Sequence, residues 1–168
     1  MPVEHILTTH HHYDHDGGNN AVKRAYPNVR ITSGKDDKVK GSNEQVSDGQ
    51  IINLCGNKIP MKCIHTPCHT KGSTCYYVET TDQPTQHSVE YQGIYKIIKN
   101  INRCIFTGDT VFLGGCGHFM EGTPDQMQRN MDMMRSLPDD TKMFGGHEYT
   151  QANFQWCYSV EKEFNPKV

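Results

Sequence analysis

Residues 9–15, Thr-His-His-His-Tyr-Asp-His, place four potential metal ligands within six positions, at His10, His12, Asp14 and His15. The preceding residues 3–7 predict a strand that leads into this stretch. Alternate residues of an extended segment point to the same side, so His10 and His12 can bind one cation, while Asp14 and His15, beyond a bend, can turn toward a second. Imidazole and carboxylate ligands suit zinc, iron or manganese. The pattern therefore predicts a dinuclear metal site.

Three further polar residues follow strand-like runs far from this stretch. His69 lies in His-Thr-Pro-Cys-His-Thr, Asp109 in Phe-Thr-Gly-Asp-Thr and His147 in Gly-Gly-His-Glu-Tyr. Each lies close to Gly or Pro, which predicts a loop at the end of a strand. Strands that each deliver one ligand to a shared edge are a common way to build a rigid site. Any one of these residues alone would be an ordinary solvated loop residue, but together they predict partners for the first cluster.

Strands and helices alternate irregularly along the chain, which predicts one α/β domain over its 168 residues. Strands are expected at residues 3–9, 29–32, 74–79, 103–107 and 143–144, with a hairpin formed by 50–55 and 58–65. Helices are expected at 19–26, 124–136 and 151–164. Residues 33–48, rich in Lys, Asp, Gly and Ser, are expected to form an exposed connection without a chemical role, and the apolar run 91–98 is ambiguous.

Composition excludes several classes of partner. The formal net charge is −2 and Lys and Arg do not cluster, so we expect no nucleic acid partner. No uninterrupted apolar stretch approaches twenty residues and the N-terminus lacks the features of a signal peptide, so we expect no membrane span or secretion. The seven cysteines form neither a paired framework nor Cys-x-x-Cys motifs, which indicates reduced thiols. We therefore expect a cytoplasmic protein, and a monomer.

The order of these ligands resembles the metallo-β-lactamase superfamily, and the flanking sequence is similar to glyoxalase II, the hydroxyacylglutathione hydrolases. The matching segments are Thr-His-His-His-Tyr-Asp-His-Asp-Gly-Gly-Asn, His-Thr-Pro-Cys-His-Thr, the run from Phe-Thr-Gly-Asp-Thr to Met-Glu-Gly-Thr, and Gly-Gly-His-Glu-Tyr-Thr. The resemblance extends from about residue 3 to 150 and is weakest at 80–101. It implies an αββα sandwich with the metal site at the edge where the two sheets meet. Relatives carry strands before the first motif and a helical, glutathione-binding region after the last, so the resemblance implies a single domain over residues 1–168, truncated at both ends.

The resemblance also implies the ligand sets. His10, His12 and His69 would hold one metal, and Asp109 would bridge it to a second metal held by Asp14, His15 and His147. Two divalent ions are expected, zinc first, with iron or manganese as alternatives. With Asp14 and Asp109 as the catalytic carboxylates, a hydroxide shared by the metals would attack a thioester carbonyl while a metal accepts the developing oxyanion.

The implied substrates are S-D-lactoylglutathione and other 2-hydroxyacyl-glutathione thioesters. Tyr149 matches a tyrosine that contacts glutathione in the family. Where relatives usually have Lys or Arg, this chain has His118, and Met120 replaces an aromatic residue. A neutral imidazole holds a carboxylate less firmly than a permanent cation does. Metal binding is therefore better supported than affinity for glutathione.

Two alternatives remain open at this stage. Persulfide dioxygenase relatives use a single iron in the same fold, and a truncated chain could bind metal without turnover. Among the remaining residues near the motifs, His11 is expected to point opposite to its neighbours if the segment is extended, and at best to support the ligands or to have a structural role. Cys68 and Cys116 could be thiolate ligands, but packing is the simpler interpretation of both.

Overall fold

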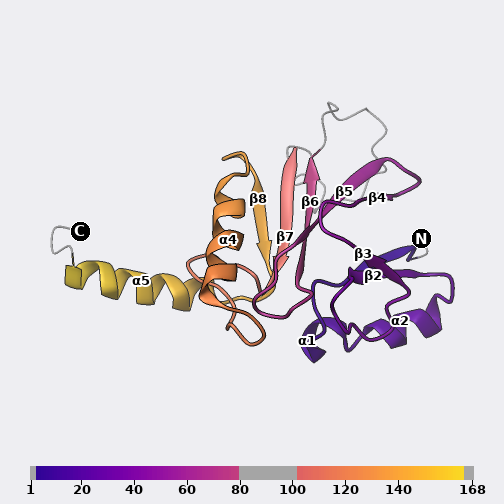
Figure 1. The fold of residues 1–168 in the computed structure, drawn as a ribbon, viewed down its shortest axis with the longest axis horizontal. Coiled ribbons are helices and arrows are strands. Elements are labelled where there is room, and N and C mark those ends of the chain that lie inside the picture. Colours follow the sequence, from indigo (N-terminus) through magenta and orange to yellow (C-terminus); the bar gives the residue numbers. More distant parts are fainter. Residues whose placement is uncertain (1–2, 80–101, 165–168) are drawn as a thin grey trace, which may run out of the picture.

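The computed structural model describes residues 3–79 and 102–164, in which eight strands form two sheets (Figure 1). The first sheet is parallel, in the order β1 (His5–Leu7), β2 (Arg30–Gly34) and β3 (Glu44–Val46). The second sheet has the order β4 (Ile51–Leu54), β5 (Ile59–His65), β6 (Thr74–Glu79), β7 (Arg103–Gly108) and β8 (Lys142–Gly145). Its strands are antiparallel neighbours except for β7 and β8, which are parallel.

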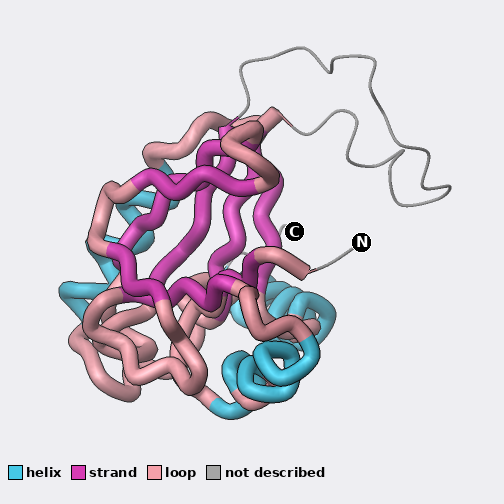
Figure 2. Tube along the Cα trace, turned by 90° about the vertical axis from the view of Figure 1, so that its right-hand side faces the viewer, coloured by secondary structure: helices cyan, strands magenta, loops and turns pink. Residues whose placement is uncertain are grey.

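Helices cover the outer faces of both sheets. Helices α1 (Tyr13–Asp16) and α2 (Asn19–Ala25) lie beside the first sheet, and α4 (Pro124–Arg135) lies beside the second (Figure 1). Viewed after a quarter turn, the strands occupy the middle of the molecule and the helices its outside (Figure 2). Helix α5 (Thr150–Phe164) extends away from this body. The predicted αββα sandwich is confirmed.

The two faces of the second sheet bury different apolar clusters. The cluster between the sheets consists of Val46, Ile52, Met61, Cys63 and Tyr76. The cluster beneath α4 consists of Ile64, Cys75, Tyr77 and Ile105, packed against Met133, Met134, Leu137 and Met143. Successive residues of a strand point to opposite faces, so each of β5 and β6 supplies both clusters. Burying a large apolar side chain contributes about 1.5–3 kcal/mol, so these clusters hold the layers together.

The start of α4 has the chemistry that its sequence predicts. The Thr123 side chain accepts a hydrogen bond from Gln126 N, and the Gln126 side chain accepts one from Thr123 N at 2.8 Å. Pro124 occupies the first helical position, where its missing N–H costs nothing. These two hydrogen bonds form a capping box, and the helix ends at Arg135, one residue before the predicted end.

Two expectations about local structure are wrong. Residues 33–48 are not simply an exposed connection: they contain β3, and Asp37, Val39 and Val46 are buried. Strand β3 forms because its backbone pairs with β2 and because Val46 packs between the sheets. The first strand is also shorter than residues 3–9, so the ligand-rich stretch begins in a loop and continues into α1. The expected connection at 80–90 and the ambiguous run 91–98 fall outside the described residues.

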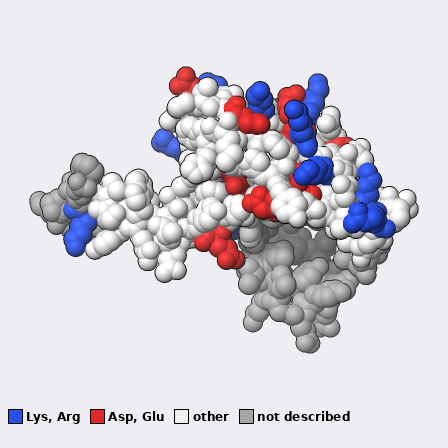
Figure 3. Space-filling model, turned by 90° about the horizontal axis from the view of Figure 1, so that it is seen from below, with Lys and Arg blue, Asp and Glu red and all other residues white. Residues whose placement is uncertain are grey.

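The described surface has mixed charge. On the face shown in Figure 3, acidic and basic side chains are scattered over the body, and most of α5 carries neither. The aromatic residues Phe154, Trp156 and Tyr158 of this helix are exposed. No helix within residues 3–79 and 102–164 is long and apolar enough to cross a membrane.

Candidate metal centre

Seven polar residues lie at one end of the two sheets because of the strand directions. Strands β5, β7 and β8 run the same way, so the residues that follow them lie at the same edge of the second sheet. His69 follows β5, Asp109 follows β7 and His147 follows β8. The loop after β1 and helix α1 bring the remaining four, His10, His12, Asp14 and His15, to the same place.

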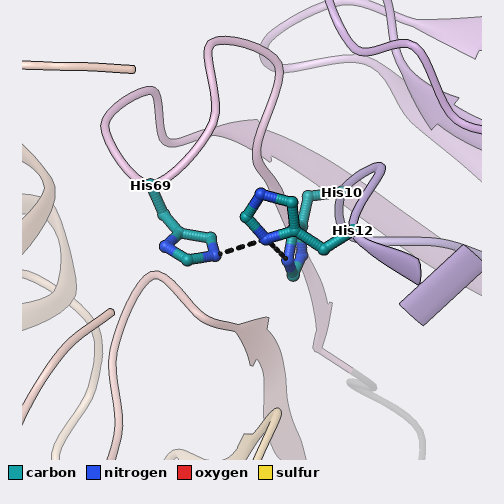
Figure 4. Close-up of side chains that lie close together, drawn as sticks. All are labelled: His10, His12 and His69. Atoms are coloured by element: carbon teal, nitrogen blue, oxygen red, sulfur yellow. Dashed lines mark hydrogen bonds between the residues drawn. The ribbon is translucent and has the colours of Figure 1, made fainter. Parts of the chain in front are cut away.

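Three histidines form the first half of the centre and are called the histidine triad: His10, His12 and His69. Their rings point toward one another (Figure 4). The Nδ1 atom of His12 lies 3.1 Å from Nε2 of His10 and 3.0 Å from Nε2 of His69. His10 and His69 are buried, and His12 is half-buried. Three imidazole nitrogens therefore face a common point.

The tautomer of the His69 ring makes this arrangement suitable for a cation. Its Nδ1 donates a hydrogen bond to the carbonyl oxygen of His118 at 2.9 Å. In the neutral ring, Nε2 then carries a lone pair and faces His12. A single N–H at Nδ1 of His12 can donate to only one of the two nearby nitrogens, Nε2 of His10 or Nε2 of His69. At least one nitrogen lone pair is therefore left without a donor. A bound cation would satisfy it, and the carbonyl of His118 would orient the ring.

The second half of the centre is called the aspartate set: Asp14, His15 and His147. The Nε2 atoms of His15 and His147 lie 3.2 Å apart, and the Oδ2 atom of Asp14 lies 3.4 Å and 3.2 Å from them, respectively. This set is more accessible than the triad. The side chain of Asp14 is 57% exposed and that of His147 is 25% exposed.

Asp109 lies between the two sets. Its Oδ1 atom is 3.2 Å from Nε2 of His15, and its Oδ2 atom is 3.6 Å from Nε2 of His69 and 3.3 Å from Nε2 of His147. Oδ1 is buried, and no described residue forms a hydrogen bond with it. A buried carboxylate oxygen without a donor is costly unless another positive group compensates it. Asp109 therefore has the position of a bridging ligand, and its buried Oδ1 atom lacks a compensating partner.

Glycines allow the chain to pass close to Asp109. Gly108 has a φ of +50°, a left-handed conformation that favours glycine, and it turns the chain at the end of β7. A Cβ at Gly117 would collide with the carbonyl oxygen of Asp109 and lie 2.8 Å from Nδ1 of His69. The motifs Phe-Thr-Gly-Asp-Thr and Gly-Cys-Gly thus have a steric reason for their glycines.

Burial and neighbouring charges set the protonation of the centre without cations. Burial, followed by the nearby His15, lowers the pKa of His10 to about 3. Burial also lowers the pKa of His12. For His15, burial is outweighed by the close contact and attraction between its ring and the Asp109 carboxylate, so its pKa is raised. The same contact lowers the pKa of Asp109 despite its burial. His10 and His12 are thus neutral and Asp109 is ionised near pH 7, the forms that bind metals.

The spacing of the donors also fits divalent cations. Zn–N bonds of 2.0–2.1 Å at tetrahedral angles put two ligand nitrogens about 3.3 Å apart. The Nδ1 atom of His12 lies 3.0–3.1 Å from the other two triad nitrogens, and the Nε2 atoms of His15 and His147 lie 3.2 Å apart. Three overlapping groups could each hold an ion: the triad, the aspartate set, and His10 with His15 and Asp109. The fold thus brings all seven predicted ligand residues together.

The residues predicted to contact substrate flank this centre. The ring of Tyr149 stacks on that of His147, with centroids 4.9 Å apart, and meets the edge of Phe112. Tyr149 is exposed, as are His118 and Met120. His118 approaches the centre through its backbone carbonyl, which orients His69.

One buried group near the centre has no local signal in the sequence. Asp37 is buried and forms hydrogen bonds with His11 and Thr70, each adjacent to a triad residue. His11 belongs to none of the potential metal groups, and its Nδ1 atom bonds to Asp37. Cys68 is packed as expected, with its Sγ atom 3.5 Å from the carbonyl of Thr123, and burial raises its pKa, whereas Cys116 is exposed and not packed. Neither thiol belongs to the three potential metal groups.

Comparison with known proteins places this centre in a family. A profile of the family described as the metallo-beta-lactamase superfamily matches residues 1–147. The chain belongs to the metallo-β-lactamase superfamily. Metal ions are therefore expected in a site with this donor set. The crystal structure of ETHE1 from Myxococcus xanthus, another protein of this fold, superposes with a TM-score of 0.68 at 22% identity and covers 100% of this chain and 64% of that one.

Curated relatives in this superfamily share more sequence. The cytoplasmic hydroxyacylglutathione hydrolase of Arabidopsis thaliana is 39% identical over 160 residues, which are 95% of this chain and 55% of that protein. The probable hydroxyacylglutathione hydrolase glo2 of Schizosaccharomyces pombe is 35% identical over 161 residues, which are 95% of this chain and 54% of that protein. The chain thus spans about half the length of the curated relatives it matches.

Proposed function

We propose that this chain carries the hydrolytic centre of a hydroxyacylglutathione hydrolase. The reaction is the cleavage of S-D-lactoylglutathione and related 2-hydroxyacyl-glutathione thioesters by water, which gives glutathione and the 2-hydroxy acid. The observation that carries the proposal is the convergence of seven ligand residues in a chain that is 33–39% identical to proteins of that name.

The proposed centre holds two divalent ions, zinc first, with iron or manganese as alternatives. The triad would hold one ion, the aspartate set the other, and Asp109 would contact both. Bound divalent cations lower the pKa of water toward neutrality and stabilise negative charge on a carbonyl oxygen. Asp109, buried and ionised, keeps the two ligand sets close to each other. The exposed Asp14 lies on the solvent side, where its carboxylate can orient the attacking water and accept its proton.

Thioester chemistry suits the groups that are present. Water attacks the carbonyl carbon, and the carbon–sulfur bond then breaks. A thiol has a pKa of about 8.5, so the thiolate departs without a strong general acid. Tyr149, His118 and Met120 are the proposed contacts of the glutathione part, because they are exposed on either side of the ligand cluster.

The proposed setting is the cytoplasm and the proposed assembly a monomer. All seven cysteines are free, which suits a reducing compartment, and the Arabidopsis relative is named as cytoplasmic. Size-exclusion chromatography with light scattering tests the monomer: a mass near 19.1 kDa is expected, and twice that mass would contradict it.

One assay separates this proposal from its alternatives. Purified protein is given S-D-lactoylglutathione, and the same sample is analysed for metals. Thioester cleavage with two divalent ions per chain is expected. A single iron, with oxygen consumption on glutathione persulfide, would identify a dioxygenase. Normal metal content without cleavage at saturating substrate would identify a chain that binds metal without turnover.

A further inference from the structure

A buried carboxylate outside the seven ligands lies where two turns of the chain meet. Asp37 follows β2, and its side chain is 0% exposed. Its oxygens accept hydrogen bonds from Nδ1 of His11, from Oγ1 of Thr70 at 2.7 Å and from the backbone N–H of Lys38 at 2.8 Å. These donors meet the cost of burying the charge.

The two side-chain donors are next to the triad in the sequence. His11 stands between His10 and His12, and Thr70 directly follows His69. His12 and His69 are 57 positions apart along the chain, yet their nitrogens lie 3.0 Å from each other. A single carboxylate thus bonds to an immediate neighbour of every member of the triad.

Backbone packing makes this link stiff. A Cβ at Gly72 would collide with the backbone N and the Cβ of Asp37, so the turn after His69 lies directly against the turn that carries Asp37. Ser73 closes the first of these turns: its Oγ lies 2.8 Å from Oγ1 of Thr70 and accepts a hydrogen bond from Thr70 N at 3.1 Å. The Thr70 hydroxyl is therefore held in place while it donates to Asp37.

His11 also approaches a third segment. Its Nε2 lies 4.0 Å from Oε1 of Glu121, and Oε2 of Glu121 accepts a hydrogen bond from Lys71 N at 2.7 Å. Glu121 belongs to the same loop as His118, whose carbonyl orients His69. The contacts around Asp37 thus reach each loop that fixes a ring of the triad.

We propose that Asp37 is a positioning residue for the triad. It sets the separation between the segment of His10 and His12 and the segment of His69, and so the affinity of the cation bound there. This inference rests on the part of the proposed function that assigns a cation to the triad, and it does not depend on thioester hydrolysis. Groups that support ligands in this way contribute about 10-fold to 100-fold in metal affinity.

The test is zinc binding by Asp37→Ala in the full 168-residue chain, without substrate. Zinc per chain is counted by elemental analysis, and each ion's affinity is measured by competition with a chromogenic chelator. One ion is expected to bind about 10-fold to 100-fold more weakly while the other keeps its affinity. The matched control is Asp36→Ala, which removes the same charge from the adjacent, exposed position and should bind as the unaltered chain does.

Smaller changes keep the test independent of folding. Thr70→Val removes only the hydroxyl that donates to Asp37, whereas Thr70→Ser retains it. The valine variant should lose affinity for one ion, and the serine variant should restore it. Wild-type affinity for both ions in Asp37→Ala and Thr70→Val would overturn the proposal. An unaltered chain that binds two ions but cleaves no thioester would instead refute the proposed activity and leave the role of Asp37 standing.

Discussion

The two halves of the centre differ in burial and in support. The triad offers only imidazoles, two of its three residues are buried, and the His118 carbonyl and the Asp37 contacts hold it. The aspartate set includes a carboxylate that is largely exposed, and the His147 ring stacks on the exposed Tyr149. A preorganised set binds its cation tightly, and an open set leaves room for water and substrate. We therefore expect the triad to hold the tighter ion and the aspartate set to face the reaction.

Asp109→Asn should have the largest effect because it removes the group shared by both halves. An amide has no negative charge to offset two cations, so both ions should bind more weakly and turnover should fall about 100-fold or more. Metal content and kcat are measured together. Asp139→Asn, which changes an exposed carboxylate, is the control. Wild-type turnover in Asp109→Asn would show that the two halves do not depend on a shared carboxylate.

Removing one ligand from each half tests the difference between them. His147→Ala should leave one tightly bound ion, while His69→Ala should leave only the weaker one. The unaltered chain should release its two ions at chelator concentrations about 10-fold or more apart. Competition titrations of the three proteins check this. Equal affinity of the remaining ion in both variants would show that burial does not distinguish the halves.

The pH dependence of the metal-free chain tests the burial of the triad. The pKa of His10 is about 3 in the folded chain and 6.5 when unfolded, so the unfolded chain binds more protons between these values. Stability should therefore fall as pH drops below 6.5. His15 acts in the opposite sense: its raised pKa gives stability at low pH that is lost as pH rises through that value.

His10→Gln isolates the contribution of the buried ring. Denaturant unfolding of metal-free protein between pH 7 and 4 should be less steep in pH for this variant, by up to about 1.4 kcal/mol per pH unit, the equivalent of one proton. The same pH slope in both proteins would mean that His10 is not shielded from protonation.

Tyr149→Phe should have the smallest effect, and it tests the substrate contacts beside the aspartate set. The phenyl ring can still stack on His147, so metal affinity should not change. Loss of the hydroxyl should raise KM for the thioester by up to about 10-fold, the worth of one hydrogen bond. Tyr149→Ala should change both KM and metal affinity. An unchanged KM in the phenylalanine variant would remove the hydroxyl from the list of substrate contacts.

Much of the centre could be predicted because its signals are local. His10, His12, Asp14 and His15 lie in one short stretch, and each remote ligand follows a strand-like run beside Gly or Pro. The directions of β5, β7 and β8 could not be derived from periodicity and are seen only in the structure. The placement of the metal site at one edge of the sheets was implied by the resemblance to a known family.

The missed features depend on contacts across long stretches of chain. Asp37 lies in Lys-Asp-Asp-Lys, a pattern typical of exposed loops, and it is buried only because donors 26 and 33 positions away close over it. Strand β3 has three residues, too few for an alternating pattern, and it forms because its backbone pairs with β2. Tertiary contacts overrode local propensity in both cases.

A crystal structure of the zinc-loaded chain, with diffraction recorded on both sides of the zinc absorption edge, tests the central claim most directly. Two anomalous peaks are predicted, one among His10, His12 and His69 and one among Asp14, His15 and His147, with Asp109 between them. A single peak, or peaks only at cysteines, would contradict a dinuclear centre built from these seven side chains.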